Sequence, residues 1–116
     1  MEVDLPFDLI VTIVNKGHCD KVITASKEAG AEGGTIIPGR GTGIREKLKI
    51  WGIPIEPEKD IILTIVPQEQ TDAILKAIVQ AGKLNQPGAG ISFVLELKKV
   101  AGICHLCRLD EVQAAS

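Results

Sequence analysis

Aromatic side chains are nearly absent from this sequence. Its 116 residues include no Tyr, one Trp and two Phe, which is 3% aromatic, whereas 45% of the residues are hydrophobic. The core must therefore be aliphatic, and a protein that stacks unpaired bases on aromatic rings would have almost nothing to stack them on. Binding of single-stranded nucleic acid is disfavoured on this ground.

A strong excess of charge is also missing. The chain carries 13 basic and 15 acidic residues, a net charge of −2, so it has no electrostatic footprint for a phosphate backbone or an anionic membrane. The mostly apolar run Leu9 to Val14 is too short to span a bilayer, and the stretch Met1 to Asp4 lacks the positive flank of a signal peptide. We therefore expect a cytoplasmic protein with no nucleic-acid partner and no direct membrane insertion.

Signs of a disulfide framework or of a catalytic apparatus are equally scarce. Three cysteines are an odd number, in a chain long enough to fold without covalent staples, so reduced thiols are expected. The serines lie in no nucleophile-elbow motif, and His18 and His105 are far apart in the sequence with no obvious orienting carboxylate. The sequence favours a single non-enzymatic domain over residues 1–116.

What the sequence does contain is an alternation of β-branched and helical patterns. We expect strands over 9–14, 33–37, 60–66 and 91–97, helices over 18–29 and from Pro67 to about Gly82, and a long mobile loop over 44–58. Pro38, Gly39, Gly41 and Gly43 are expected to break any regular ladder after the second strand.

The element order strand, helix, strand, strand, helix, strand is that of the ferredoxin-like α+β fold. In this fold a four-stranded antiparallel sheet carries two helices on one face. Ile and Val occupy both parities of the strands over 9–14 and 60–66, which is expected if the second face of the sheet is buried as well. In a chain this short the natural cover is another subunit.

Two glycine-rich stretches could approach an anion with their backbone N–H groups. They are Gly39 to Gly43 after the second strand, and Gly88 to Gly90, which we call the glycine turn, before the last strand. Plain turns explain the same spacing equally well. Neither stretch is a Walker motif, because no Gly-Lys-Ser/Thr follows.

Thirteen positions resemble the pattern of the PII signal-transduction family, from the first strand to Ile103. They are Val22, Ala25, Gly30, Gly33, Thr35, Gly41, Gly43, Lys59, Pro67, Gly88, Gly90, Phe93 and Val100. The resemblance implies a homotrimer with inward-facing sheets and nucleotide sites in the clefts between subunits. It also implies that residues 44–58, the long segment, dock onto a partner protein such as a membrane transporter.

The resemblance further implies a set of nucleotide-binding positions. Thr35 matches the family residue near the adenine, Gly41 and Gly43 match the start of the long segment, and Gly88 and Gly90 flank the phosphate-contacting turn. Thr42 and Ala89 lie between these glycines and complete the candidate set.

Charged family positions have been lost. The chain has Leu63 in place of Glu, Ala89 in place of Asp, Ile91 in place of Lys, and Gly102 and Cys104 in place of two Arg. Each missing cation removes a charge-assisted contact of about 1.5 to 3 kcal/mol. AMP or ADP is therefore expected rather than Mg-ATP, with Arg40, Arg45 or Lys83 as replacement cations. Uridylylation of a tyrosine in the long segment is excluded, because the chain has none.

The long segment supplies the expected contacts to a partner. We expect them from Arg45, Lys47, Ile50 and Trp51, because an exposed Trp with apolar neighbours is typical of an interface anchor. The alternative for Trp51 is packing against its own subunit.

Cys104-His105-Leu106-Cys107 opens the tail over 104–116 and allows a second hypothesis. Two thiolates and an imidazole suit a metal or a redox pair, although a closed zinc site needs four ligands, which His18 and Cys19 or a second subunit would have to complete. A metal-binding or thiol-redox trimer resembling CutA-type proteins is therefore an alternative. A structural interaction module without a ligand is another, with ordinary structural thiols in the tail.

Overall fold

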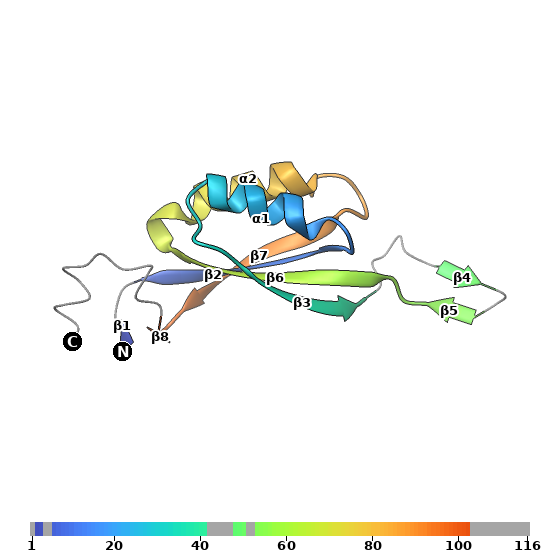
Figure 1. Cartoon of the computed structure of the whole chain (residues 1–116), viewed down its shortest axis with the longest axis horizontal. Coiled ribbons are helices and arrows are strands. Elements are labelled where there is room, and N and C mark those ends of the chain that lie inside the picture. The colour runs from blue at the N-terminus through green and yellow to red at the C-terminus, as the bar shows by residue number, and fades with distance from the viewer. Residues whose placement is uncertain (1, 4–5, 42–47, 51–52, 103–116) are drawn as a thin grey trace.

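The chain forms one antiparallel sheet with two helices on the same side (Figure 1). The computed structural model describes residues 2–3, 6–41, 48–50 and 53–102, and the structural statements below concern these residues. Its main elements are β2 (Phe7–Asn15), α1 (Cys19–Glu28), β3 (Thr35–Arg40), β6 (Glu58–Pro67), α2 (Thr71–Gly82) and β7 (Gly90–Leu97). The strand order β3-β6-β2-β7, antiparallel throughout, confirms the ferredoxin-like α+β prediction.

Two predicted boundaries were wrong. β3 continues through Pro38 and Gly39 to Arg40, because it is an edge strand paired only with β6, where a proline is tolerated on the free side. The second helix does not begin at Pro67, which instead ends β6 opposite Phe7. A 3₁₀ turn, η1 (Gln68–Gln70), separates Pro67 from α2.

The long segment is more regular than an irregular loop, which corrects the expectation for residues 44–58. It contains β4 (Leu48–Ile50) and β5 (Ile53–Ile55), which pair antiparallel with Leu48 opposite Ile55. Its last residue, Glu58, already belongs to β6. The Gly41 amide donates to the Pro57 carbonyl at 3.2 Å and closes the base of the segment. In Figure 1 the hairpin projects beyond the sheet, away from both termini.

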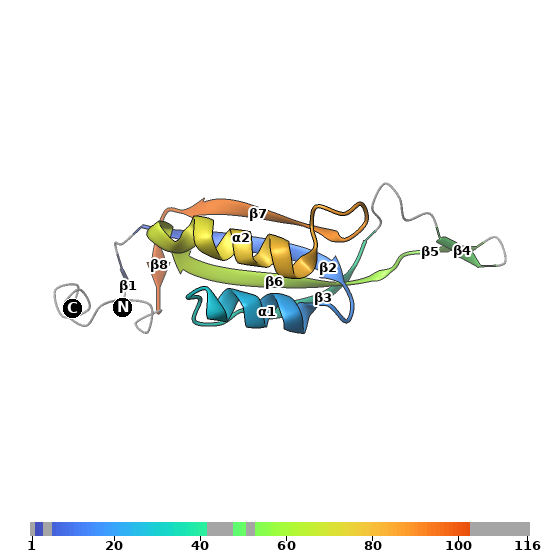
Figure 2. The ribbon, with the colours of Figure 1, turned by 90° about the horizontal axis from the view of Figure 1, so that it is seen from above.

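The core lies between the sheet and the helices, which run side by side above it (Figure 2). The buried hydrophobic cluster there is aliphatic, as the scarcity of aromatic residues predicts: Ile10, Val14, Val22, Ala31, Ile62, Val66, Ile74 and Ile78. Phe7, at the start of β2, is a buried aromatic residue outside this cluster. At the end of the molecule nearest the termini, β1 (Glu2–Val3) pairs antiparallel with β8 (Val100–Ala101), which the sequence did not predict.

The opposite face of the sheet is apolar and carries no helix. Strand register places three rows of side chains on it, because residues directly opposite each other in an antiparallel pair share a face. The rows are Thr35–Leu63–Val11–Phe93, Ile37–Ile61–Ile13–Ile91 and Ile65–Leu9–Leu95. Leu95 and Ile91 remain 50% and 55% exposed. We call these residues the open face, and its apolarity fits the expectation of a second subunit.

Candidate ligand site at the base of the long segment

The predicted ligand loops lie at the same end of the sheet, one at each of its two edge strands. Register aligns Gly39 of β3, Lys59 of β6 and Asn15 of β2 in a row, and Val14 beside Asn15 pairs with Gly90 of β7. The glycine turn and the base of the long segment therefore lie at the same end. The β4–β5 hairpin projects from this end of the sheet (Figure 1).

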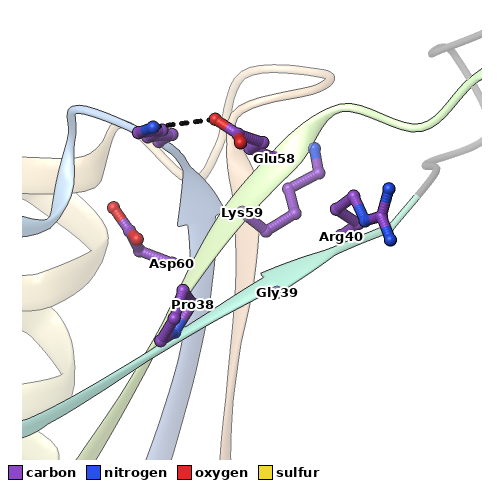
Figure 3. Close-up of a pocket in the computed structure, with 7 residues that line it drawn as sticks. Pro38, Gly39, Arg40, Glu58, Lys59 and Asp60 are labelled. Carbon is purple, nitrogen blue, oxygen red and sulfur yellow. Dashed lines mark ion pairs between the residues drawn. The ribbon is translucent and has the colours of Figure 1, made fainter.

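A cavity of about 300 Å³ opens beside the ends of β3 and β6 (Figure 3). It is lined by Lys16, Pro38, Gly39, Arg40, Glu58, Lys59 and Asp60. Three of these side chains are cationic and two are carboxylates, so the formal charge of the lining is 3 − 2 = +1. The excess of positive charge favours an anionic ligand.

Lys16 and Glu58 neutralise each other at the rim of this cavity. Their side chains form an ion pair of 2.9 Å, and the Lys16 amide donates to the Glu58 carbonyl at 3.2 Å. The hydrogen bond to Glu58 raises the pKa of Lys16 above its ordinary 10.5. Lys16 is therefore cationic at neutral pH, and Arg40 and Lys59 are the other two cations that line the cavity.

Asn15 connects Lys59 to the glycine turn. The Lys59 ammonium donates to Asn15 Oδ1 at 2.5 Å, and Asn15 Nδ2 donates to the Gly88 carbonyl oxygen at 3.2 Å. The amide oxygen of Asn15 therefore accepts from a donor, and the amide nitrogen donates to an acceptor. This polar connection runs across the end of the sheet from β6 to the turn before β7.

The glycine turn is shaped by the fold as well as by any ligand. Gly90 has φ +142°, and a Cβ there would lie 2.3 Å from the Ile13 carbonyl oxygen. Gly88 has φ +80° but open space around it. The Ala89 amide donates to the Gln86 carbonyl at 3.2 Å, so it is already engaged within the turn. Close packing of β7 on β2 thus requires Gly90 whether or not a ligand binds.

Gly41 is under no such constraint in a single chain. Among the described residues, a Cβ at this position would touch Lys59 Cγ at 3.9 Å, an ordinary contact. The described neighbours therefore impose no steric need for glycine here. Space for a ligand or for a neighbouring chain remains as a reason for the small residue.

Thr35 does not join the other candidates within one chain. It is an exposed residue of β3, at one edge of the sheet, whereas the glycine turn precedes β7 at the other edge. Three strand spacings of about 4.8 Å separate these edges. Leu63, where the family has Glu, lies beside Thr35 on the open face.

Several predicted residues fall outside the described parts of the chain. They are Thr42, Gly43, Arg45, Lys47, Trp51, Cys104, His105 and Cys107. For Ile50, the structure describes only the backbone position in β4. Of the suggested replacement cations, Arg40 lines the cavity. Lys83 lies at the C-terminal cap of α2 with φ +52°.

Sequence reasoning missed Asn15, Lys16, Glu58 and Asp60 as site residues. Asn15 and Lys16 belong to a stretch identified only as a turn, and the two acidic residues were assigned to the long segment and the next strand. Their proximity follows from strand register, which no local pattern in the sequence reveals.

A thiol also lies near this end of the sheet. Burial, followed by a hydrogen bond to Asp60, raises the pKa of Cys19 above its ordinary 9.0. Within the described ranges, no group of three or more His, Cys, Asp or Glu side chains could hold a metal ion. The metal hypothesis for Cys104, His105 and Cys107 stays a prediction.

Together, the fold and this site define a small ferredoxin-like protein with a cavity at the base of a projecting hairpin. The family model described as Nitrogen regulatory protein P-II matches residues 7–105, and the chain belongs to this family. A comparison with curated proteins found no significant match. Neither helix in the described part of the chain has the length and apolarity needed to cross a membrane.

Solved structures support the fold. The chain is similar to Arabidopsis thaliana PII bound to citrate, with a TM-score of 0.66, 21% identity and coverage of 90% of this chain and 87% of that one. It is also similar to part of a Bacillus cereus protein related to NIF3, with a TM-score of 0.63 and 23% identity. That match covers 80% of this chain and 26% of the Bacillus protein.

Proposed function

We propose that this protein is a cytoplasmic PII-like regulator that binds an adenine nucleotide between subunits and signals through its long segment to a partner such as a membrane transporter. The observation that carries the proposal is that the glycine turn and the base of the long segment lie at the same end of the sheet, where Asn15 bonds both to Lys59 and to Gly88. The base of the long segment borders a 300 Å³ cavity that Arg40 and Lys59 line. A regulator is favoured over an enzyme because family members are regulatory proteins by description.

A homotrimer supplies what a single chain lacks. Thr35 and the glycine turn lie at opposite edges of the sheet, so one small ligand reaches both when a second copy brings its own edge strand alongside. The open face gives the subunits an apolar surface to bury, with Ile91 and Leu95 at least half exposed in the single chain. The resemblance to PII proteins implies the same arrangement.

AMP or ADP fits the described cations better than Mg-ATP. Ile91 replaces the family's phosphate-binding Lys, and the side chain stays on the apolar open face. Arg40 and Lys59 offer two positive charges at the cavity. The structure of Arabidopsis PII bound to citrate supports small organic anions as ligands of this fold.

Isothermal titration with AMP, ADP, ATP, cyclic AMP and citrate tests the proposal, after light scattering has established the oligomeric state. We expect a trimer that binds AMP or ADP with micromolar affinity. A trimer that binds none of the five would overturn the proposed ligand class and move attention to Cys104, His105 and Cys107.

The Gly41→Leu variant tests whether the nucleotide binds at the base of the long segment. The wider side chain should weaken nucleotide binding at least tenfold while the chain still folds, because an added Cβ has room at this position. Ala73→Leu, on the exposed side of α2, is the control that introduces the same side chain away from the site. Equal affinities for the two variants would exclude the base of the long segment from the site.

A further inference from the structure

The Asn15 side chain makes two hydrogen bonds at the end of the sheet where the candidate site lies. Its Nδ2 group donates to the Gly88 carbonyl at 3.2 Å, and its Oδ1 accepts from the Lys59 ammonium. Asn15 is the last residue of β2 and lies directly opposite Lys59 in the register. The bond to Lys59 is partly buried, whereas the bond to Gly88 is exposed to solvent.

We propose that Asn15 is a positioning residue that couples the glycine turn to the base of the long segment. A ligand bound at the turn would shift the Gly88 carbonyl, this shift would reach Lys59 through the Asn15 amide, and Lys59 would reposition the end of the long segment, whose last residue is Glu58. The signalling role rests on the proposed function. The coupling between the turn and Lys59 is a property of the chain without ligand.

Asn is the side chain that this position requires. The amide presents one donor and one acceptor at the same reach, and here each meets its complement. Asp would keep the acceptor for Lys59 but oppose the Gly88 carbonyl with a second acceptor. Leu matches the shape of Asn and makes neither bond. These substitutions therefore separate the two hydrogen bonds from the space that the residue fills.

The ion pair of Lys16 with Glu58 is a natural control for this connection. It joins the residue after Asn15 to the residue before Lys59, so it lies at the same place in the fold. Both side chains are largely exposed, at 67% and 60%, and the side-chain hydrogen bond that reaches Gly88 comes from Asn15 rather than from this pair. Removal of Lys16 changes the local charge by one unit, as removal of Lys59 does.

A double-mutant cycle in the ligand-free protein tests the coupling. Amide hydrogen exchange over residues 86–90 is measured in the wild type and in the Asn15→Leu, Lys59→Met and double variants. Lys59→Met should accelerate exchange at the turn about twofold to tenfold in the wild-type background, the range expected for loss of one hydrogen bond. It should have no effect in the Asn15→Leu background, and Lys16→Met should have none in either.

An equal effect of Lys59→Met in both backgrounds, or no effect in the wild type, would overturn the coupling. Asn15→Asp provides the second variant if Asn15→Leu folds poorly, and it too should abolish the response of the turn. Because no ligand is present, this result is independent of whether nucleotides bind.

The signalling step has its own readout. Trp51 is the sole tryptophan and lies in the long segment, so its fluorescence reports on that segment. At AMP concentrations that saturate each protein, Asn15→Asp should lose most of the AMP-induced change in Trp51 emission. A full fluorescence response in this variant would overturn the signalling role, whereas absence of AMP binding by the wild type would contradict the proposed function instead.

Discussion

At the scale of single residues, the glycines of the two loops have different physical origins. Gly90 combines φ +142° with a backbone oxygen 2.3 Å from where a Cβ would lie, whereas Gly41 has only an ordinary contact at 3.9 Å. The sequence shows both as members of glycine-rich stretches. The packing of β7 on β2 explains the first glycine, so only the second is evidence for a bound ligand or subunit.

Gly90→Ala should lower the free energy of unfolding by about 2 to 4 kcal/mol, since the added methyl forces β7 away from β2 and strains the backbone. Gly41→Ala should change it by less than about 0.5 kcal/mol. Urea unfolding of both variants measures the difference. Similar stabilities would show that the turn relaxes to accept the methyl group.

The pKa of Cys19 is raised, chiefly by burial and then by Asp60, from an ordinary value of 9.0. In the Cys104→Ser, Cys107→Ser background, iodoacetamide labelling of Cys19 in the folded protein should reach half its maximal rate above pH 9.0. The unfolded chain in urea should titrate near the ordinary value. A half-maximal pH for the folded protein at or below that of the unfolded chain would contradict the assignment.

The same shift has a defined sign for stability. Because the folded state holds the thiol proton more tightly than the unfolded state, this group's contribution is fully present below pH 9.0 and is lost as the pH rises through the raised pKa. Cys19→Ser should remove this part of the alkaline decline in the free energy of unfolding.

At the scale of elements, α2 is tied to β2 by a buried polar contact. Thr71 begins the helix, and its hydroxyl donates to Asp8 Oδ2 at 2.7 Å, where Asp8 is only 8% exposed. Gln68 of η1 donates to the other oxygen of the same carboxylate at 3.1 Å. The 3₁₀ turn and the first residue of α2 thus present one donor each to the same buried carboxylate.

Thr71→Val should lower the free energy of unfolding by about 1 to 3 kcal/mol, because the buried Asp8 oxygen loses its donor while the shape of the side chain is kept. Thr71→Ser, which retains the hydroxyl, is the control and should lose less. Thermal unfolding followed by circular dichroism distinguishes the two. Equal losses would attribute the effect to the methyl group rather than to the hydrogen bond.

At the scale of the whole molecule, the open face determines how copies associate. Three mainly apolar rows cover it, and Leu95 is half exposed on the edge strand β7. Leu95→Lys should dissociate the proposed trimer, because a charge would have to be buried between subunits without a partner. Light scattering should report the monomer mass.

Lys76→Glu, on the exposed helical side of the molecule, is the matched control and should leave the assembly intact. If Leu95→Lys keeps the mass of the wild type, then the open face is not the subunit interface. Far-ultraviolet circular dichroism of the variant distinguishes dissociation from unfolding, since a folded monomer retains its signal.

The order of elements, the aliphatic core and the apolarity of both sheet faces were determined by the residues along the chain. β-branched runs, helical spacing and turn glycines act over a few neighbouring positions, so they are visible without coordinates. The same local patterns ended β3 before Pro38, began α2 too early and did not predict the short β4–β5 hairpin. There the pairing with another strand outweighed the local preference.

Only the tertiary structure brought Asn15, Lys59 and Gly88 into one polar connection and separated Thr35 from the glycine turn. Asn15 lies 44 positions before Lys59 along the chain and 73 positions before Gly88. Strand register sets which residues face each other, and it arises from the packing of whole strands rather than from any short motif. The composition therefore defines the kind of protein, while the register of four strands assembles its site.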